Sequence, residues 1–210
     1  MRRSVVVAAS VALSGFVCLC AGYGCAQEPG RAESSKGAPS YALSANGREE
    51  ILFVGYYGGS AMDSHRYHLY GDGRLVREIF DQGRDIVLRT DEVEIPQADI
   101  DRIFQPLVAA RVPELSEDRV RQATGGIRGE DLGVDLAAVR VRMSLASYQS
   151  SPSKAREPLQ TDTWLNGPGL LAREFPDFAE AKAVADLGRQ LDRHFPKTVY
   201  EAERSTEAQR

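Results

Sequence analysis

The amino-acid sequence predicts one α+β domain, an antiparallel β-sheet of about five or six strands with two α-helices packed on one face. Two observations lead to this fold class. Strand-like and helix-like segments follow one another in the order meander, helix, hairpin, helix, so the strands are grouped apart from the helices. In addition, residues 137–145 alternate apolar with small or polar side chains, which is typical of a strand with one face on a core and one in water.

The first group of strands is predicted between residues 51 and 88. Residues 51–54 form a short apolar run beside glycines, and Tyr67 and Leu69 alternate with polar neighbours in the next strand. The sequence Gly-Asp-Gly at residues 71–73 then favours a tight turn, because Asp and Gly accept positive φ angles. Residues 75–80 and 86–88 continue the pattern, so we expect a β-meander.

The first helix is predicted to begin at Pro96, since a proline there removes no hydrogen bond that the helix would make. Pro106 should kink or end its last turn. The polar, glycine-rich residues 113–135 are expected to form a long loop. Apolar residues recur at helical spacing on one face of this helix: Ile100, Ile103, Phe104, Leu107 and Val108.

A hairpin and a second helix complete the predicted domain. Residues 159–165 should pair with the alternating strand at residues 137–145, and residues 166–169 should close that strand with a turn. Pro176 is expected to open the last helix and Pro196 to stop it. The inner face of this helix is predicted to carry six apolar residues: Phe178, Ala181, Val184, Leu187, Leu191 and Phe195.

The domain boundaries follow from composition. Residues 1–26 are predicted to be a signal peptide, and residues 27–47, rich in Pro, Gly, Ser and charge, a flexible linker. Residues 48–196 are expected to form the folded domain. Residues 197–210 have few apolar side chains and are predicted to be a disordered tail.

The leader has the features of an export signal. A basic start at Arg2 and Arg3 precedes an uncharged segment that extends to Gln27, and all three cysteines of the chain lie within it. Three outcomes stay open: lipidation of Cys25, simple cleavage after Ala26, and an uncleaved membrane anchor. We therefore expect an exported protein of the cell envelope, either periplasmic or tethered to the membrane by a lipid, with secretion as the alternative.

Composition excludes several classes of function. Without Arg2 and Arg3, 24 basic side chains face 30 acidic ones, a formal charge of −6. This disfavours non-specific binding of nucleic acid and electrostatic adhesion to anionic membranes. Because no cysteine follows Cys25, the domain has no intramolecular disulfide, thiolate metal site or catalytic cysteine. No motif indicates a cofactor.

The residues Gly22-Tyr23-Gly24-Cys25 resemble the lipobox of bacterial lipoproteins, in which a small residue precedes the cysteine that becomes the lipidated N-terminus. Gly22 stands where that family usually has Leu, and Tyr23 where it has a small or β-branched residue. The order of elements, with an early hairpin at residues 71–73, is also similar to small exported bacterial domains of unknown function. The resemblance implies a lipid on Cys25 and transfers no catalytic residue.

The sequence offers one candidate catalytic set. His65 and His68 could act as a base for Ser60 or for a nearby acidic residue in a hydrolase. However, Ser60 lacks the G-x-S-x-G context of a nucleophile elbow. A spacing of three also sends two histidines of a strand to opposite faces, which disfavours a shared metal site. We therefore predict neither catalytic residues nor a metal site, and keep the hydrolase as the alternative.

A candidate binding surface is more consistent with the sequence. Tyr and Trp are favoured at binding sites because they contribute area with few rotatable bonds. We thus expect a non-enzymatic module whose partner is an envelope protein or a cell-wall component, with the membrane reached only through the lipid on Cys25. The predicted surface comprises five aromatic residues: Tyr56, Tyr57, Tyr67, Tyr70 and Trp164.

Overall fold

The structure is a computed structural model that describes residues 37–44, 46–58, 63–127, 131 and 137–196. The leader with Cys25, the serine at position 60 and the tail predicted at residues 197–210 lie outside these ranges. No helix within the described part of the chain has the length and apolar character needed to cross a bilayer.

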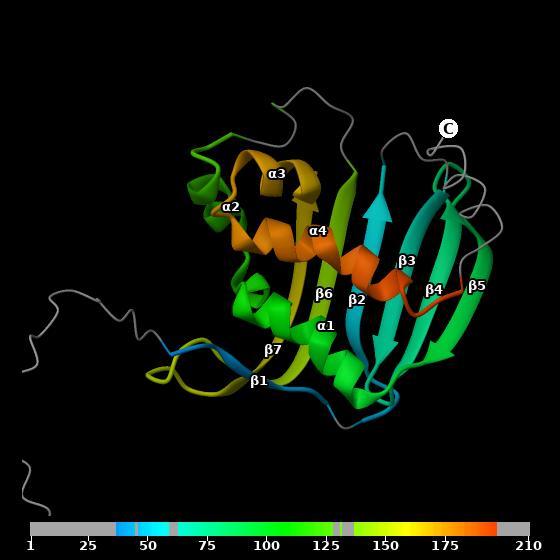
Figure 1. The fold of residues 1–210 in the computed structure, drawn as a ribbon, viewed down its shortest axis with the longest axis horizontal. Helices are drawn as coiled ribbons and strands as arrows, with labels where there is room; N and C mark the ends of the chain where they lie inside the picture. Colours follow the sequence, from blue (N-terminus) through cyan, green and yellow to red (C-terminus); the bar gives the residue numbers. More distant parts are fainter. Residues whose placement is uncertain (1–36, 45, 59–62, 128–130, 132–136, 197–210) are drawn as a thin grey trace, which may run out of the picture. The chain divides into compact units, whose positions relative to one another are not determined.

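The described residues form an α+β domain with one antiparallel sheet, as the sequence predicts (Figure 1). The sheet order is β7-β6-β2-β3-β4-β5, and β1 pairs with β6 beyond the end of β2. Seven strands are present in the described ranges rather than five or six. Their bounds are β1 Ser40–Ala42, β2 Glu50–Tyr57, β3 Asp63–Tyr70, β4 Arg74–Asp81, β5 Ile86–Glu94, β6 Ala138–Gln149 and β7 Glu157–Asn166.

The helices of the described residues all lie on one side of the sheet (Figure 1). The described residues contain four α-helices rather than two, together with a short 3₁₀ helix, η1. We call the side of the sheet that these helices cover the helix-covered face, and the other side the open face. The helices are α1 Gln97–Ala109, η1 Val112–Glu114, α2 Glu117–Ala123, α3 Pro168–Glu174 and α4 Ala179–Asp192.

Strand β1 places folded structure inside the range predicted to be a linker. Ala42 pairs with Ser147, and the ring of Tyr41 stacks on Phe104 of α1 with centroids 6.0 Å apart. The sequence signal was hidden because only one residue of this three-residue strand, Tyr41, is a large apolar one. The ordered domain therefore begins before Arg48.

The helix α2 lies where a loop was predicted. It begins at Ser116, whose hydroxyl accepts a hydrogen bond from the amide of Arg119, and Glu117 and Asp118 occupy its first turn. None of its residues is buried, so it lacks the apolar periodicity that reveals an amphipathic helix. Its start depends on local capping.

The helix α3 lies where a turn was predicted to close the hairpin. Gly167 takes the left-handed conformation with φ of 58°, and Pro168 then starts the helix at a position where proline is favoured. Leu171 packs into the core. The same residues that indicate a turn thus also start a helix.

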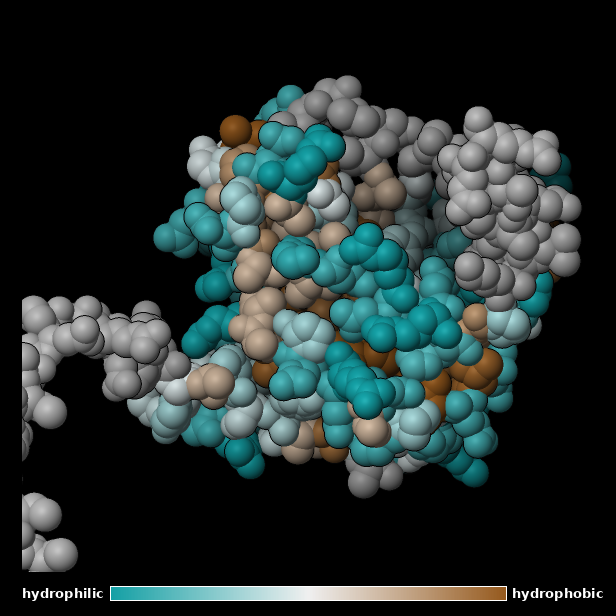
Figure 2. All heavy atoms as spheres, in the orientation of Figure 1, coloured by the Kyte–Doolittle hydropathy of each residue, from teal (hydrophilic) through white to brown (hydrophobic). Residues whose placement is uncertain are grey.

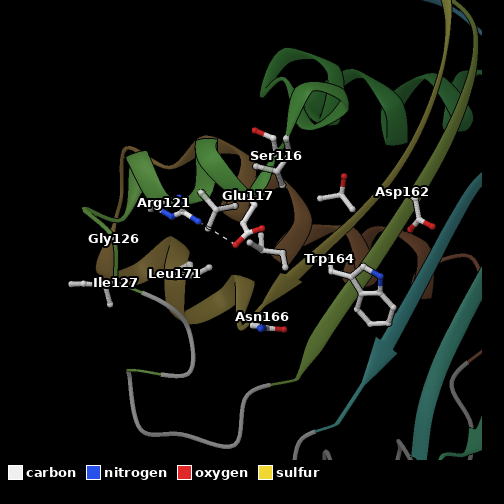
Figure 3. Close-up of a pocket in the computed structure, with 13 residues that line it drawn as sticks. Ser116, Glu117, Arg121, Gly126, Ile127, Asp162, Trp164, Asn166 and Leu171 are labelled. Carbon is white, nitrogen blue, oxygen red and sulfur yellow. Dashed lines mark hydrogen bonds and ion pairs between the residues drawn. The ribbon is translucent and has the colours of Figure 1, made fainter.

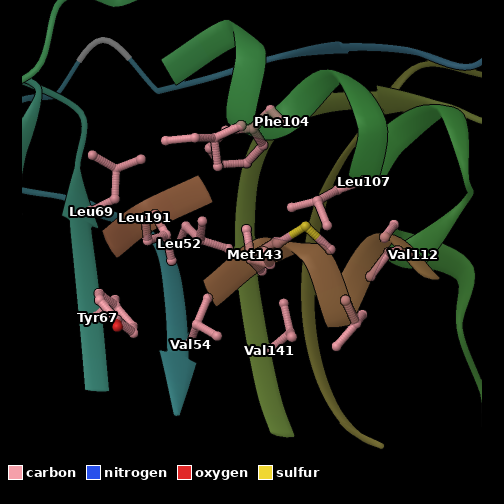
Figure 4. Close-up of a cluster of buried hydrophobic side chains, with 14 of the residues drawn as sticks. Leu52, Val54, Tyr67, Leu69, Phe104, Leu107, Val112, Val141, Met143 and Leu191 are labelled. Carbon is pink, nitrogen blue, oxygen red and sulfur yellow. The ribbon is translucent and has the colours of Figure 1, made fainter. Parts of the chain in front are cut away.

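The core lies between the sheet and the helices α1 and α4 (Figure 4). Every residue predicted for the inner faces of the two helices is buried, but α4 begins at Ala179 rather than at Pro176 and ends at Asp192, so Phe178 and Phe195 flank the helix. The alternating residues of β6, among them Val141 and Met143, point into the same core. Burial of each such side chain contributes about 1.5–3 kcal/mol, so this layer stabilises the fold. Figure 2 shows hydrophilic side chains on the outer surface of the helices, with hydrophobic ones between them.

Helix α4 approaches β2 closely at one glycine. A Cβ atom built on Gly188 would lie 2.5 Å from the hydroxyl oxygen of Tyr56 and 2.9 Å from its Cζ. Burial raises the pKa of Tyr56, which agrees with its position beneath the helix. Gly188 is therefore required for this packing distance.

A buried cation connects β4 to the C-terminal end of α4. The side chain of Arg77 is 1% exposed, and its guanidinium bonds Asp91 at 2.9 Å and Asp192 at 3.3 Å. Asp192 also accepts a hydrogen bond of 2.6 Å from the hydroxyl of Tyr67. Burial opposes the ionisation of Asp91, but Arg77 and Arg89 outweigh it and lower the pKa of that carboxyl. The network joins β3, β4, β5 and α4.

We predict that Gly188→Ala lowers the free energy of unfolding by about 1–3 kcal/mol, because the added methyl group overpacks Tyr56. Adding Tyr56→Phe should recover part of the loss by removing the contacting oxygen. The matched control is Gly169→Ala in α3, where the new Cβ meets nothing within 4 Å. Urea unfolding measures all three, and equal stability of Gly188→Ala and wild type would contradict the packing argument.

We predict that Arg77→Met costs about 1–3 kcal/mol, since it removes the cation between Asp91 and Asp192, although Asp91 keeps its pair with Arg89. Arg74→Met on the same strand is the control. Its side chain is 37% exposed, pairs with Glu92 at 3.6 Å and stacks on the Tyr70 ring at 3.8 Å, so the loss should be about 1 kcal/mol or less. Comparable losses for both variants in urea unfolding would refute the role of burial.

Candidate functional site

The five predicted surface aromatics divide between the two faces of the sheet. Tyr56 lies in the helix-covered face, and Tyr67 is buried there against Phe195 and Asp192. They are core residues. Tyr70 lies near the end of β3, where the guanidinium of Arg74 stacks on its ring at 3.8 Å.

Tyr57 and Trp164 come together on the open face. Their ring centroids are 5.1 Å apart, and Trp164 is 51% exposed. The ring of Tyr57 lies over Gly55, where an added Cβ would approach its Cε2 atom to 2.6 Å. Gly55 is thus covered by the aromatic residue two positions along its own strand, and it has no side chain that would displace this ring.

Arginine side chains stack on the aromatic rings of the open face. The guanidinium of Arg140 lies 5.3 Å from the Trp164 ring, and that of Arg66 lies 3.7 Å from the Phe80 ring. Arg140 also forms a bidentate pair with Asp162, at 2.8 and 2.6 Å. This hydrogen bonding raises the pKa of Arg140 and lowers that of Asp162, so the pair stays ionised.

A groove of about 530 Å³ runs beside this aromatic pair (Figure 3). One wall consists of β7. The facing wall is formed by α2 and the residues that flank it, including Val120 and Ile127, with Leu115 and Leu171 adding apolar surface. Figure 3 shows Arg121 and Ile127 on one side of the groove and Trp164 and Asp162 on the other. We call it the β7 groove.

The shape of the β7 groove follows from the residues of β7 that line it. Five consecutive residues, 162–166, contribute to the lining. Side chains of consecutive strand residues point to opposite faces, so all five share one groove only if it faces the edge of the strand. Among the described residues β7 pairs with β6 alone, which leaves its outer edge without a neighbouring strand.

The two candidate histidines are not brought together. His68 lies on the open face, where its Nδ1 is 2.6 Å from Glu50 and its Nε2 is 3.7 Å from Glu78. His65 has the opposite strand parity and lies beside Tyr67, with ring centroids 6.3 Å apart. The proposed nucleophile, Ser60, lies outside the described residues. Within them no three His, Cys, Asp or Glu side chains are grouped to hold a metal ion.

The wall formed by α2 is the part of the site that sequence reasoning missed. Because the sequence predicts a loop over residues 113–135, it gives no sign that Val120 and Ile127 lie opposite Trp164. The capping pattern that starts at Ser116, followed by Glu117 and Asp118, is the signal that could have revealed the helix. No local pattern could reveal that this helix faces β7.

Comparison with known proteins gives no relative: no protein-family profile, no curated protein and no solved structure matches the chain.

Proposed function

We propose that this protein is an exported binding module of the cell envelope, tethered by a lipid on Cys25, that holds an extended segment of a partner protein in the β7 groove. The observation that supports the proposal is the lining of the groove by residues 162–166 of an edge strand. An unpaired edge presents main-chain N–H and C=O groups that can add a further strand. A compact ligand would use only part of such an edge.

The side chains around the β7 groove support the same ligand. A strand lying beside β7 would direct alternate side chains to the two faces of the sheet. On the helix-covered side they would meet apolar groups from Leu115, Val120 and Leu171. On the open side they would meet the exposed ring of Trp164, which Arg140 and Tyr57 hold in place. The groove therefore favours a segment with an apolar residue directed toward α2.

Charge at the rim of the β7 groove adds a preference. Glu117 and Arg121 of α2 form an ion pair of 3.3 Å and are largely exposed, and Asp162 lies on the facing wall. Arg121 also approaches Asp118. Asp162 is already paired with Arg140, so the excess negative charge near this rim comes from Glu117 and Asp118, which share Arg121, and a basic residue in the bound segment would be favoured.

The tether is supported by the leader. Cys25 follows a basic and apolar segment, and the polar residues after it would separate a lipid from the folded domain. The first strand, β1, begins at Ser40, so 14 residues (26–39) separate Cys25 from it.

We predict that the mature N-terminus is Cys25 carrying acyl chains. Mass spectrometry of the protein from the membrane fraction should find the added acyl mass, and Cys25→Ala should release the protein from membranes. Cys20→Ala is the matched control and should stay bound. A mature chain that starts at Gln27, or membrane association that persists in Cys25→Ala, would refute the lipid tether.

We predict that short peptides with alternating apolar and polar residues shift the fluorescence of Trp164, the only tryptophan of the chain. Val120→Lys should weaken this binding at least about tenfold, because it places a charge in the apolar wall. The control Gln105→Lys adds the same charge on the exposed side of α1 and should bind normally.

Two further probes test the mode of binding. Peptides with N-methyl groups on alternate amides keep their side chains but lose main-chain donors, so the series that blocks the edge-facing amides should bind weakly. Equal binding of all methylated peptides would exclude strand addition. Soluble cell-wall glycan fragments provide the other ligand class. If they shift the fluorescence and the peptides do not, a cell-wall component replaces the protein segment as the ligand.

A further inference from the structure

A second hollow lies along β7, nearer the start of the strand than the β7 groove. Its volume is about 520 Å³, and three consecutive residues of β7, 157–159, contribute to its lining. As with residues 162–166 in the β7 groove, consecutive strand residues share one hollow only if it faces the edge of the strand. Pro113 and Glu114 of η1 also line it, so we call it the η1 hollow. Both hollows therefore open on the same unpaired edge of β7.

The two hollows are divided where the chain passes from η1 to α2. Pro113 and Glu114 line the η1 hollow, whereas the next two residues, Leu115 and Ser116, line the β7 groove. On β7 the division falls at residues 160–161, which line neither of these two hollows. A segment that follows the whole edge of β7 would thus pass one hollow, then the junction between η1 and α2, then the other hollow.

The polar groups in the wall of the η1 hollow already bond to one another. The carboxylate of Glu114 accepts a hydrogen bond of 2.5 Å from the hydroxyl of Tyr148 and two, of 3.1 and 3.2 Å, from the guanidinium of Arg111. Burial, together with the hydrogen bond to Glu114, raises the pKa of Tyr148 well above its usual value, so this hydroxyl stays a donor. This wall therefore offers a ligand little that is unpaired.

The remaining surface of the η1 hollow favours an apolar side chain. Pro113, Ala155 and Leu159 line it with side chains of carbon alone. The charged residues Lys154 and Glu157 also line it, but both are exposed and can keep their charges in water when the hollow is filled. Burying an apolar side chain here is favourable, whereas burying a charge without a partner is costly.

The spacing between the two hollows follows from the alternation along β7. This alternation is unbroken from Leu159 to Leu165, because the register shift of the hairpin adds its extra residue to β6. Leu159, Thr161 and Thr163 thus point to the helix-covered face, like the buried Leu165. Residues of an added strand opposite Leu159 and Thr163 would point the same way, four positions or about 13 Å apart. The residue opposite Thr161 would pass the junction between the hollows, so it has to be small.

We propose that the segment held along β7 carries two large apolar side chains four residues apart, with a small residue midway between them. One apolar side chain occupies the β7 groove opposite Thr163, and the other occupies the η1 hollow opposite Leu159. Pro158 has no N–H to offer, so main-chain pairing ends near Leu159 and the second side chain lies at the end of the added strand. This inference rests on the function proposed above and adds the sequence pattern of the partner segment.

Two peptides of identical composition test the spacing. Lys-Thr-Leu-Thr-Ala-Thr-Leu-Thr-Lys has its leucines four residues apart, and Lys-Thr-Leu-Thr-Leu-Thr-Ala-Thr-Lys has them two apart. Titrations followed by the fluorescence of Trp164 should give a dissociation constant at least about tenfold lower for the first peptide. Equal dissociation constants would overturn the inference of two anchors while leaving strand addition in place. If neither peptide binds, the proposed function fails and this inference fails with it.

A variant of the η1 hollow separates the second anchor from the first. Ala155→Phe fills the hollow from an exposed loop position, so it should weaken binding of the peptide with spacing four at least about tenfold. A peptide whose second leucine is replaced by alanine uses only the β7 groove and should bind this variant and wild type equally. The control Ser153→Phe adds the same ring to the same loop outside the lining and should bind both peptides like wild type. Equal effects of Ala155→Phe and Ser153→Phe, or equal weakening of both peptides by Ala155→Phe, would overturn the inference.

Discussion

Because the described helices pack on one face of the sheet only, each strand has to meet a core on one side and water on the other. Consecutive residues of a strand therefore lie in different environments, one in the core and the next on the open face. Tyr56 lies beneath α4, where Gly188 leaves room for it, while Tyr57 lies across Gly55 on the open face. Two adjacent tyrosines that look equivalent in the sequence therefore serve as a core residue and as part of a candidate binding surface.

On the open face, arginine side chains cover the aromatic rings that a layer of helices would otherwise bury. Phe53 and Phe80 are both nearly buried although the described helices pack on the other face, because Arg142 and Arg66 stack on their rings at 4.2 and 3.7 Å. Each of these guanidinium groups also has a carboxylate partner, Glu50 for Arg142 and Asp85 for Arg66. The face is thus both charged and rich in aromatic rings, with little net charge to attract a highly charged ligand.

The two edges of the sheet differ in what stands beside them. The edge of β7 faces α2 across a groove, whereas the described residues place no helix beside the apolar residues of β5. Both edges present main-chain groups and exposed apolar side chains such as Trp164 and Val87. We propose a partner segment for the first because it has a second wall.

The α+β class, the meander, the hairpin and the inner faces of α1 and α4 could be predicted because apolar periodicity and turn residues record them locally. The segments that were missed, β1, α2 and α3, are short and have few apolar residues, so tertiary contacts and capping decide them. Less of the candidate site than of the fold could be predicted from the sequence. The sequence predicts Trp164 as part of a binding surface. It does not predict that Tyr56 and Tyr67 belong to the core or that Val120 lies opposite β7. Both depend on pairing between strands that are far apart in the chain. By itself the sequence determined which segments alternate between apolar and polar side chains. Only the tertiary structure decided which aromatic residues meet, because the face that a strand buries is set by what packs against it.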